Sequence, residues 1–165
     1  RVSLEELMTI KGIKDAKAAT ILAAVELGRR LSDIPKETRV RITSGADVYM
    51  LFRSRMTHLE QEHFHCLYLN TKSEVIKDDL LFIGTVNQTV IHPREIFSRA
   101  VRVNASAILF VHNHPTGDAT PSEADVKATR TLQRSGELMG IHVIDHIVIG
   151  KDEYHSIMSD TKTRL

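Results

Sequence analysis

The sequence predicts an α/β (α+β) fold, in which a curved and mostly antiparallel sheet is flanked by helices. Stretches with helical spacing of apolar residues alternate along the chain with short apolar runs of strand length. With 165 residues and 42% hydrophobic content, the chain can bury one ordinary core plus a small appendage. Polar residues around Pro35 mark a linker, so we expect an N-terminal segment over residues 1–36 and the principal domain over residues 37–165.

The individual helices and strands are predicted from the spacing of apolar residues, from capping residues and from helix-ending residues. Ser44 is placed to cap the second helix, and Gly140 is placed to end the last one. We expect helices from Asp15 to near Leu31, from Ala46 to Leu59, from Pro93 to Val101 and from Pro121 to about Leu138. The expected strands cover residues 64–69, 74–76, 81–86, 107–112 and 141–149, with 88–90 as a further candidate.

The most informative stretch follows the apolar run 105–111, where one residue separates His112 from His114. Alternate residues of an extended strand project from the same face, so both imidazoles would point to one side. Pro115 then removes a backbone donor and ends the strand.

A helix start follows this strand. Thr120 offers a capping hydroxyl, Pro121 suits the first helical position and Glu123 suits the third. With Thr120 as the cap, Ser122 and Asp125 are three residues apart and share a face in the first turns. That face can be aimed back at the two histidines.

His112, His114 and Asp125 form a ligand set typical of catalytic zinc, because three protein ligands leave a fourth tetrahedral position for water. A structural four-cysteine site is excluded, since Cys66 is the only cysteine. The apolar run around Cys66 indicates a buried core residue rather than a nucleophile. We therefore expect one zinc ion (Zn²⁺) per chain.

These residues match a known signature. The spacing of His112, His114, Ser122 and Asp125 resembles the JAMM metalloprotease motif, His-x-His-x7-Ser-x2-Asp, at every fixed position. The resemblance implies the JAMM/MPN α/β fold, which is similar to that of cytidine deaminases. It also implies zinc-dependent hydrolysis.

The motif's remaining member is a glutamate that begins the first strand of the domain. Glu62 is the best counterpart in this sequence, and Glu60 is the competing candidate. His65 replaces the usual glycine of the motif, and Asn113 replaces the usual serine or threonine between the histidines. Both departures resemble the bacterial RadC branch rather than the eukaryotic deubiquitinases.

RadC-like features extend beyond the metal motif and cover roughly residues 40–155. They lie at residues 82–87, 92–97, 104–107 and 145–150. Residues 7–18 resemble the second half of the helix-hairpin-helix segment that precedes this domain in RadC proteins. We therefore expect a partial helix-hairpin-helix segment before the linker, and a chain truncated at Arg1.

The resemblance implies a JAMM-type hydrolase that cleaves a peptide, isopeptide or related amide. Zinc in the site would lower the pKa of its water toward about 7, and Glu62 would act as the general base. Ser122 would donate a hydrogen bond to the oxyanion of the tetrahedral intermediate. Asn113 is expected to support the ligands or contact substrate. Asp145 and His146, within an apolar run, are further candidates for a place in or near the site.

The alternative is a DNA-associated module, as the DNA-repair label of RadC-like proteins implies, in which the metal site supports structure or partner binding. The net charge of only +1 means that affinity for DNA must come from a local patch. Two helix faces offer such patches: Lys127, Arg130 and Arg134, and Arg94, Arg99 and Arg102. The competing interpretation is that both are ordinary solvated faces.

No apolar stretch approaches the roughly 20 residues needed to cross a bilayer, and no apolar signal segment begins the sequence. A single cysteine fits a reducing compartment. We therefore expect a cytoplasmic, bacterial protein that makes no membrane contact. Its partners would be a protein or peptide substrate, with DNA as the alternative.

Overall fold

A computed structural model of the chain describes residues 2–32, 39–84 and 92–164. The chain divides into two compact units, Arg1–Thr38 and Arg39–Leu165. The boundary expected near residue 36 lies outside the described residues. Among the described helices, none is both long enough and apolar enough to span a bilayer.

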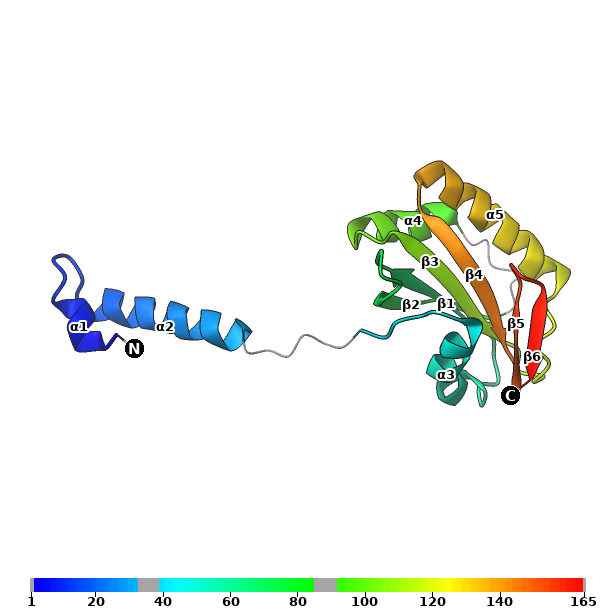
Figure 1. Cartoon of the computed structure of the whole chain (residues 1–165), viewed down its shortest axis with the longest axis horizontal. Helices are drawn as coiled ribbons and strands as arrows, with labels where there is room; N and C mark the ends of the chain where they lie inside the picture. Colours follow the sequence, from blue (N-terminus) through cyan, green and yellow to red (C-terminus); the bar gives the residue numbers. More distant parts are fainter. Residues whose placement is uncertain (1, 33–38, 85–91, 165) are drawn as a thin grey trace. The chain divides into compact units, whose positions relative to one another are not determined.

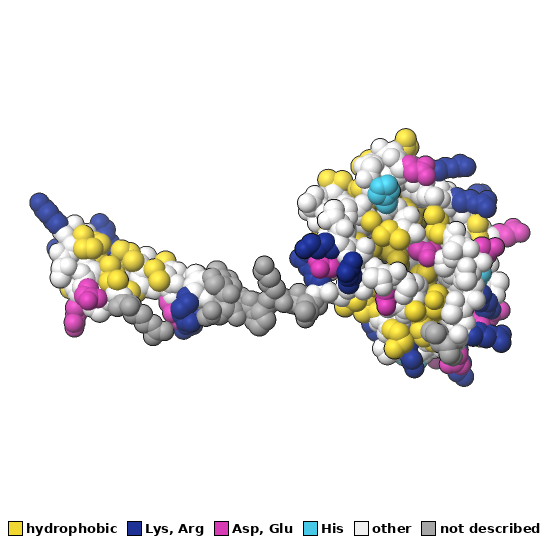
Figure 2. All heavy atoms as spheres, in the orientation of Figure 1, with side chains coloured by type: hydrophobic (Ala, Val, Ile, Leu, Met, Phe, Trp, Pro, Cys, Tyr) yellow, Lys and Arg dark blue, Asp and Glu magenta, His cyan; other side chains and the backbone are white. Residues whose placement is uncertain are grey.

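The first unit consists of α1 (Leu4–Met8) and α2 (Asp15–Ser32), joined by a turn in which Gly12 has a positive φ of 92°. Ser3 caps α1 through a reciprocal capping box with Glu6. Ala18 is the one buried apolar residue among the described residues of this unit. Apolar side chains therefore remain on its surface, as Figure 2 shows.

The second unit contains, within its described residues, a six-stranded sheet of order β2-β1-β3-β4-β5-β6. Strands β3 and β4 are parallel, and the other neighbours are antiparallel. This confirms the predicted α/β fold with a mostly antiparallel sheet. The strands are β1 (His63–Leu69), β2 (Val75–Ile83), β3 (Ala107–Asn113), β4 (His142–Ile149), β5 (Glu153–Ser156) and β6 (Thr161–Arg164).

Helices cover both faces of this sheet (Figure 1). Helix α3 (Gly45–Met56) packs on one face, and α4 (Pro93–Arg102) and α5 (Glu123–Met139) pack on the other. Each face therefore buries its own apolar cluster, because successive strand residues point to opposite sides. Phe52 of α3 lies in one cluster, and Phe97 of α4 and Leu132 of α5 lie in the other.

Strand β3 lies between β1 and β4 and is buried along its whole length. It ends at Asn113, so the metal motif begins where the most buried strand of the sheet leaves the core. The α5 crossover then returns the chain to the neighbouring parallel strand β4. This connection brings the start of α5 beside the end of β3, as the motif spacing predicted.

The prediction of separate strands at 74–76 and 81–86 was wrong, because β2 is one continuous strand. The charged residues Lys77, Asp78 and Asp79 interrupt the apolar pattern, but an edge strand tolerates charge. Asp78 pairs with Arg55 at 2.8 Å, and Asp79 is likewise paired. The end of the second predicted strand and the candidate at 88–90 lie outside the described residues.

One helix end and two strands also differ from the sequence prediction. Helix α3 ends at Met56 rather than Leu59, with Thr57 as its C-cap. Strands β5 and β6 were not predicted at all. Each has four residues, and polar or charged residues dominate both, so neither carries the apolar signature of a core strand.

Candidate metal centre

Two histidines lie at the end of β3 with their Nε2 atoms 3.0 Å apart. His112 is fully buried on the face that α5 covers, and Phe64 stacks beside it with ring centroids 5.9 Å apart. His114 follows just after the strand, where its backbone N–H donates to the Ile149 carbonyl of β4 at 3.0 Å. The sheet therefore fixes the main chain on both sides of the pair.

Asp125 completes the group from the first turn of α5. Its carboxylate lies 3.5 Å from His112 Nε2 and 3.6 Å from His114 Nε2. Donor atoms of the three residues all lie within 4.8 Å of one another, which makes them a candidate metal-binding set. Burial raises the pKa of Asp125, but the two histidines and Ser122 outweigh it and hold that pKa far below its usual range. Asp125 is thus an anionic candidate ligand.

Ser122, not Thr120, is the N-cap of α5. Its hydroxyl accepts from the Asp125 N–H and donates to Asp125 Oδ2 at 2.6 Å, and Asp125 Oδ2 also accepts the Ser122 N–H. Thr120 instead belongs to the turn before the helix, where its amide and hydroxyl both donate to Asp118 Oδ1. The capping box therefore orients the very carboxylate that faces the histidines.

A buried hydrogen-bond chain fixes which nitrogen of His112 carries its proton. Thr129 Oγ1 donates to the Asp125 carbonyl at 2.7 Å, so it must accept from His146 Nδ1, which lies within hydrogen-bonding distance. Burial and the neighbouring His112 keep the pKa of His146 well below its usual value, so this ring is neutral. His146 Nε2 then accepts from His112 Nδ1 at 2.8 Å. His112 Nε2 is left with a free lone pair.

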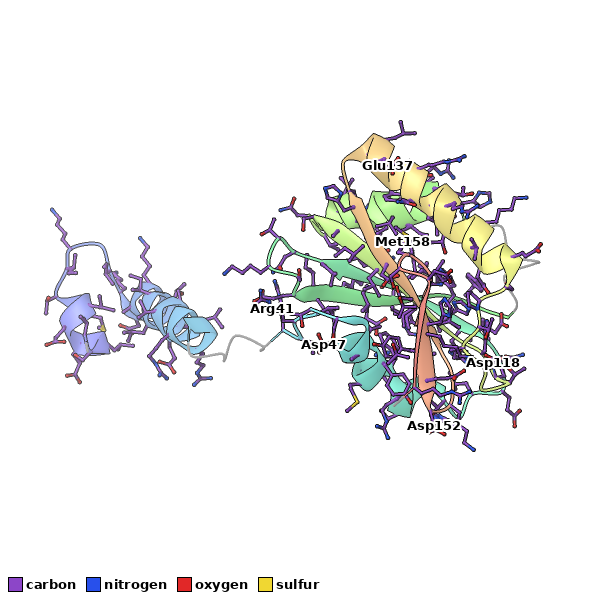
Figure 3. The ribbon with its side chains drawn as sticks, turned by 45° about the vertical axis from the view of Figure 1, so that its right-hand side comes forward. Arg41, Asp47, Asp118, Glu137, Asp152 and Met158 are labelled. Carbon is purple, nitrogen blue, oxygen red and sulfur yellow. The ribbon has the colours of Figure 1, made fainter. Side chains whose placement is uncertain are left out.

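His114 is oriented in the same way by the loop that precedes α5. Its Nδ1 donates to the Asp118 carbonyl at 2.8 Å, which leaves Nε2 as the ligand atom. Lys162 of β6 forms an ion pair with Asp118 Oδ1 of this loop at 2.6 Å and a second one with Glu153 Oε1 of β5 at 2.7 Å. Figure 3 shows Asp118 in this loop, at the end of the sheet where the β4–β5 turn carries Asp152.

The arrangement fits a bound cation. Two imidazole nitrogens and one carboxylate converge, and each imidazole already uses its other nitrogen as a donor. Without a metal ion or a proton between them, the two Nε2 lone pairs 3.0 Å apart would repel each other. A metal ion with nitrogen and oxygen ligands removes that repulsion and uses all three groups at once.

The remaining predicted residues divide between this centre and its surroundings. Glu62, half-buried just before β1, is close enough for its charge to act on His114, whereas Glu60 is exposed. Asn113 is buried and bonds to the main chain of residues 61 and 63. Asp145 instead accepts from Ser156 Oγ at 2.7 Å and has no contact with the metal ligands among the described hydrogen bonds.

Sequence reasoning missed three residues that support the centre: Thr129, Glu153 and Lys162. Thr129 is four residues after Asp125 on α5, so the two share a helix face, and this spacing was the available signal. Glu153 and Lys162 lie on strands that were not predicted. No local pattern marks them, because their role depends on the pairing of distant segments.

Comparison with known proteins agrees with this geometry. Residues 42–163 match the family described as the RadC-like JAB domain. The chain belongs to this family. A UPF0758 protein of Staphylococcus haemolyticus is 46% identical over 159 residues, which is 96% of this chain and 70% of that protein. A UPF0758 protein of Listeria monocytogenes is 44% identical over 155 residues, or 94% of this chain and 69% of that protein.

Membership of the RadC-like JAB family confirms the resemblance carried by the histidine motif. The matched range contains every residue of the candidate centre, from Glu62 to Lys162. The names of the related proteins state no substrate and no reaction. The chemistry of the centre therefore has to be argued from its own residues.

Thr129→Val tests the buried hydrogen-bond chain. Valine keeps the shape of threonine but removes the acceptor for His146 Nδ1, so His146 and then His112 lose their fixed proton positions. We expect metal affinity to fall by about 10–100-fold in a competition assay with a chelating dye. Thr131→Val is the matched control, because the Thr131 hydroxyl donates only to the Lys127 carbonyl at the exposed side of α5. Equal affinity in both variants would contradict the proposed hydrogen-bond chain.

The metal-induced rise in melting temperature should depend on pH. Burial lowers the pKa of His114, but Asp125, the Asp118 carbonyl and Glu62 outweigh it and the net shift is upward. In the metal-free protein, the protonated His114 therefore adds stability below the unfolded pKa of about 6.5, which is lost as pH rises through the higher folded pKa. A metal must displace that proton. Saturating metal should thus raise the melting temperature more at about pH 8 than at about pH 6. A larger rise at the lower pH would be the opposite result.

Proposed function

We propose that the protein is a zinc-dependent hydrolase that cleaves a peptide, isopeptide or related amide bond. The observation that carries this proposal is the convergence of two oriented imidazole nitrogens and a carboxylate, with Glu62 near enough for its charge to act on His114. Zinc suits this set, because it favours nitrogen and carboxylate oxygen ligands and three protein ligands leave a position open. Zinc in such a site lowers the pKa of water toward about 7 and polarises a carbonyl.

Glu62 is the proposed general base. It is half-buried at the start of β1, and its charge reaches His114. In that position its carboxylate can take a proton from the attacking water and pass it to the leaving amine. Glu60 is exposed, which makes it the weaker candidate for a proton transfer inside the site.

Ser122 is the proposed donor to the oxyanion. In the resting structure its hydroxyl donates to Asp125 Oδ2, so this proton is already directed at the site. A rotation of the hydroxyl would redirect it to the oxygen on which charge develops. One such donor contributes about 2.7–4 kcal/mol to lowering the barrier. Ser122 also opens onto a groove of about 440 Å³ along α5, which offers space for a substrate.

Glu62→Gln and His114→Ala should fail in different ways. His114→Ala removes a direct ligand, so zinc and the stability that it contributes should both be lost. Glu62→Gln keeps a side chain of the same shape that cannot accept a proton. Its turnover should fall by roughly 10²–10⁴, with zinc content and melting temperature nearly unchanged.

The measurement combines zinc analysis, thermal melting and release of new amino groups from randomised peptides and lysine isopeptides. Hydrolysis by the unaltered protein should stop with a chelator and return with added zinc. Loss of zinc from Glu62→Gln would make Glu62 a ligand, whereas full hydrolysis by that variant would move the base to another residue, first to Glu60.

DNA binding is the second candidate function, and one surface favours it. Lys127, Arg130 and Arg134 are exposed along one face of α5, and none makes an ion pair with another described residue. By contrast, Arg99 on α4 is held by Asp79 at 2.8 Å. Free cations on a helix face are what phosphate contacts require.

Replacing Lys127, Arg130 and Arg134 together by alanine tests this second candidate. If the α5 face is only solvated, affinity for duplex DNA should not change at any salt concentration. If it binds phosphates, affinity should fall and the dependence of log K on log salt should become shallower by about 0.9 for each phosphate that the variant no longer neutralises. Fluorescence anisotropy with labelled duplex over a salt series distinguishes the two outcomes.

A further inference from the structure

The residue between the two histidines holds the main chain on both sides of Glu62. Asn113 Oδ1 accepts from the His63 N–H at 2.8 Å, and Asn113 Nδ2 donates to the Gln61 carbonyl at 3.1 Å. Asn113 is 1% exposed, whereas Gln61 is exposed and His63 half-buried, so both bonds are partly buried. Its carboxamide thus spans Glu62 without contacting the Glu62 side chain in any described bond.

This contact continues the β1–β3 ladder past its last backbone pair. The ladder runs from Leu69↔Ala107 to Phe64↔His112. Beyond His112 the backbone pairing with β1 ends, whereas β3 remains paired with β4 through Asn113 and the His114 N–H donates to the Ile149 carbonyl at 3.0 Å. The Asn113 side chain supplies the donor and the acceptor that the backbone no longer offers to β1. Only a carboxamide carries both groups in the geometry of a peptide bond.

A third bond completes the support of this segment. The Gly84 N–H donates to the Glu62 carbonyl at 2.8 Å, from the residue that follows β2. The main chain is therefore held at Gln61, Glu62 and His63 in succession. The Gly84 bond extends the β1–β2 pairing one residue past His63, so strand alternation places Glu62 on the side of Phe64, whose ring stacks against His112. The three bonds hold the main chain of Glu62 on the histidine face of the sheet.

We infer that Asn113 is a positioning residue for Glu62. The inference rests on the proposed function, because it assigns Asn113 its effect through the proposed base. Asn113 then connects the candidate ligands with the proposed base. Its neighbours in sequence are His112 and His114, and its side chain holds the main chain on both sides of Glu62. A displacement of a catalytic group by about 1 Å can reduce turnover by about 10²-fold. Loss of the two Asn113 side-chain hydrogen bonds should therefore reduce turnover measurably.

Asn113→Ala is the test variant, and Asn70→Ala is its matched control. Asn70 makes a similar clamp at the opposite end of β1, where its Oδ1 accepts from the Lys72 and Glu74 N–H groups at 2.8 and 3.0 Å. Both variants should keep cobalt(II) affinity within about 3-fold, because neither removes a ligand. In the cobalt-loaded protein, Asn113→Ala should shift the pH midpoint of the visible absorption in the direction produced by Glu62→Gln, and Asn70→Ala should not.

Turnover of the randomised peptides gives the second readout through a double-mutant cycle. Asn113→Ala should reduce turnover by about 10–10²-fold in the unaltered protein and should cause no further loss in Glu62→Gln. An equal loss in both backgrounds, or an unshifted cobalt midpoint, would overturn the inference. If Asn113→Ala does not fold, Asn113→Asp replaces it: this variant retains the acceptor for His63, replaces the donor to Gln61 by a second acceptor and adds a negative charge, so its readout is the double-mutant cycle with Glu62→Gln.

Failure of the proposed function gives a different pattern. In that case the unaltered protein shows no chelator-sensitive hydrolysis. The cobalt titration still reports whether Asn113 acts through Glu62, so the positioning inference stands or falls on that measurement alone.

Discussion

The structure of the centre depends on one constraint: the imidazoles of His112 and His114 must each use one nitrogen in a hydrogen bond to the protein, so that the other nitrogen is free for a metal. The chain from the Asp125 carbonyl through Thr129 and His146 to His112 meets this constraint with each proton assigned. The Asp118 carbonyl does the same for His114. This series of hydrogen bonds ends at the main-chain carbonyl of Asp125, the third candidate ligand. The same bonds therefore orient His112 and hold Asp125 in place.

The fold supplies the rigidity that this constraint requires. Strand β3 is buried on both faces, so the end that carries His112 cannot shift without disturbing two apolar clusters. Helix α5 packs on the same sheet through Leu132, which fixes its first turn opposite β3. The edge hairpin of β5 and β6 then ties down the intervening loop through Glu153 and Lys162. Ligand geometry thus follows from packing as well as from hydrogen bonds.

The histidine motif and the fold class were predictable because both leave local patterns. Alternation along 107–112 placed His112, and the spacing of Ser122 and Asp125 indicated a helix start. The choice between Thr120 and Ser122 as the cap was not predictable, because each has an acidic residue three positions later and the turn in which Thr120 bonds to Asp118 has no periodic signature. The charged residues at the centre of β2 led to the wrong prediction of two separate strands for a similar reason. Their ion-pair partners Arg55 and Arg99 lie on helices that are distant in the sequence.

X-ray absorption at the zinc edge of the purified protein tests whether His112, His114 and Asp125 hold the metal. Coordination by these residues should give a shell of nitrogen and oxygen ligands at about 2.0–2.1 Å with the multiple scattering of two imidazoles. No sulfur is expected, because Cys66 is buried in the apolar cluster beneath α4 and burial raises the pKa of its thiol well above the usual range. A sulfur shell at about 2.3 Å, or zinc without imidazole scattering, would rule out this coordination.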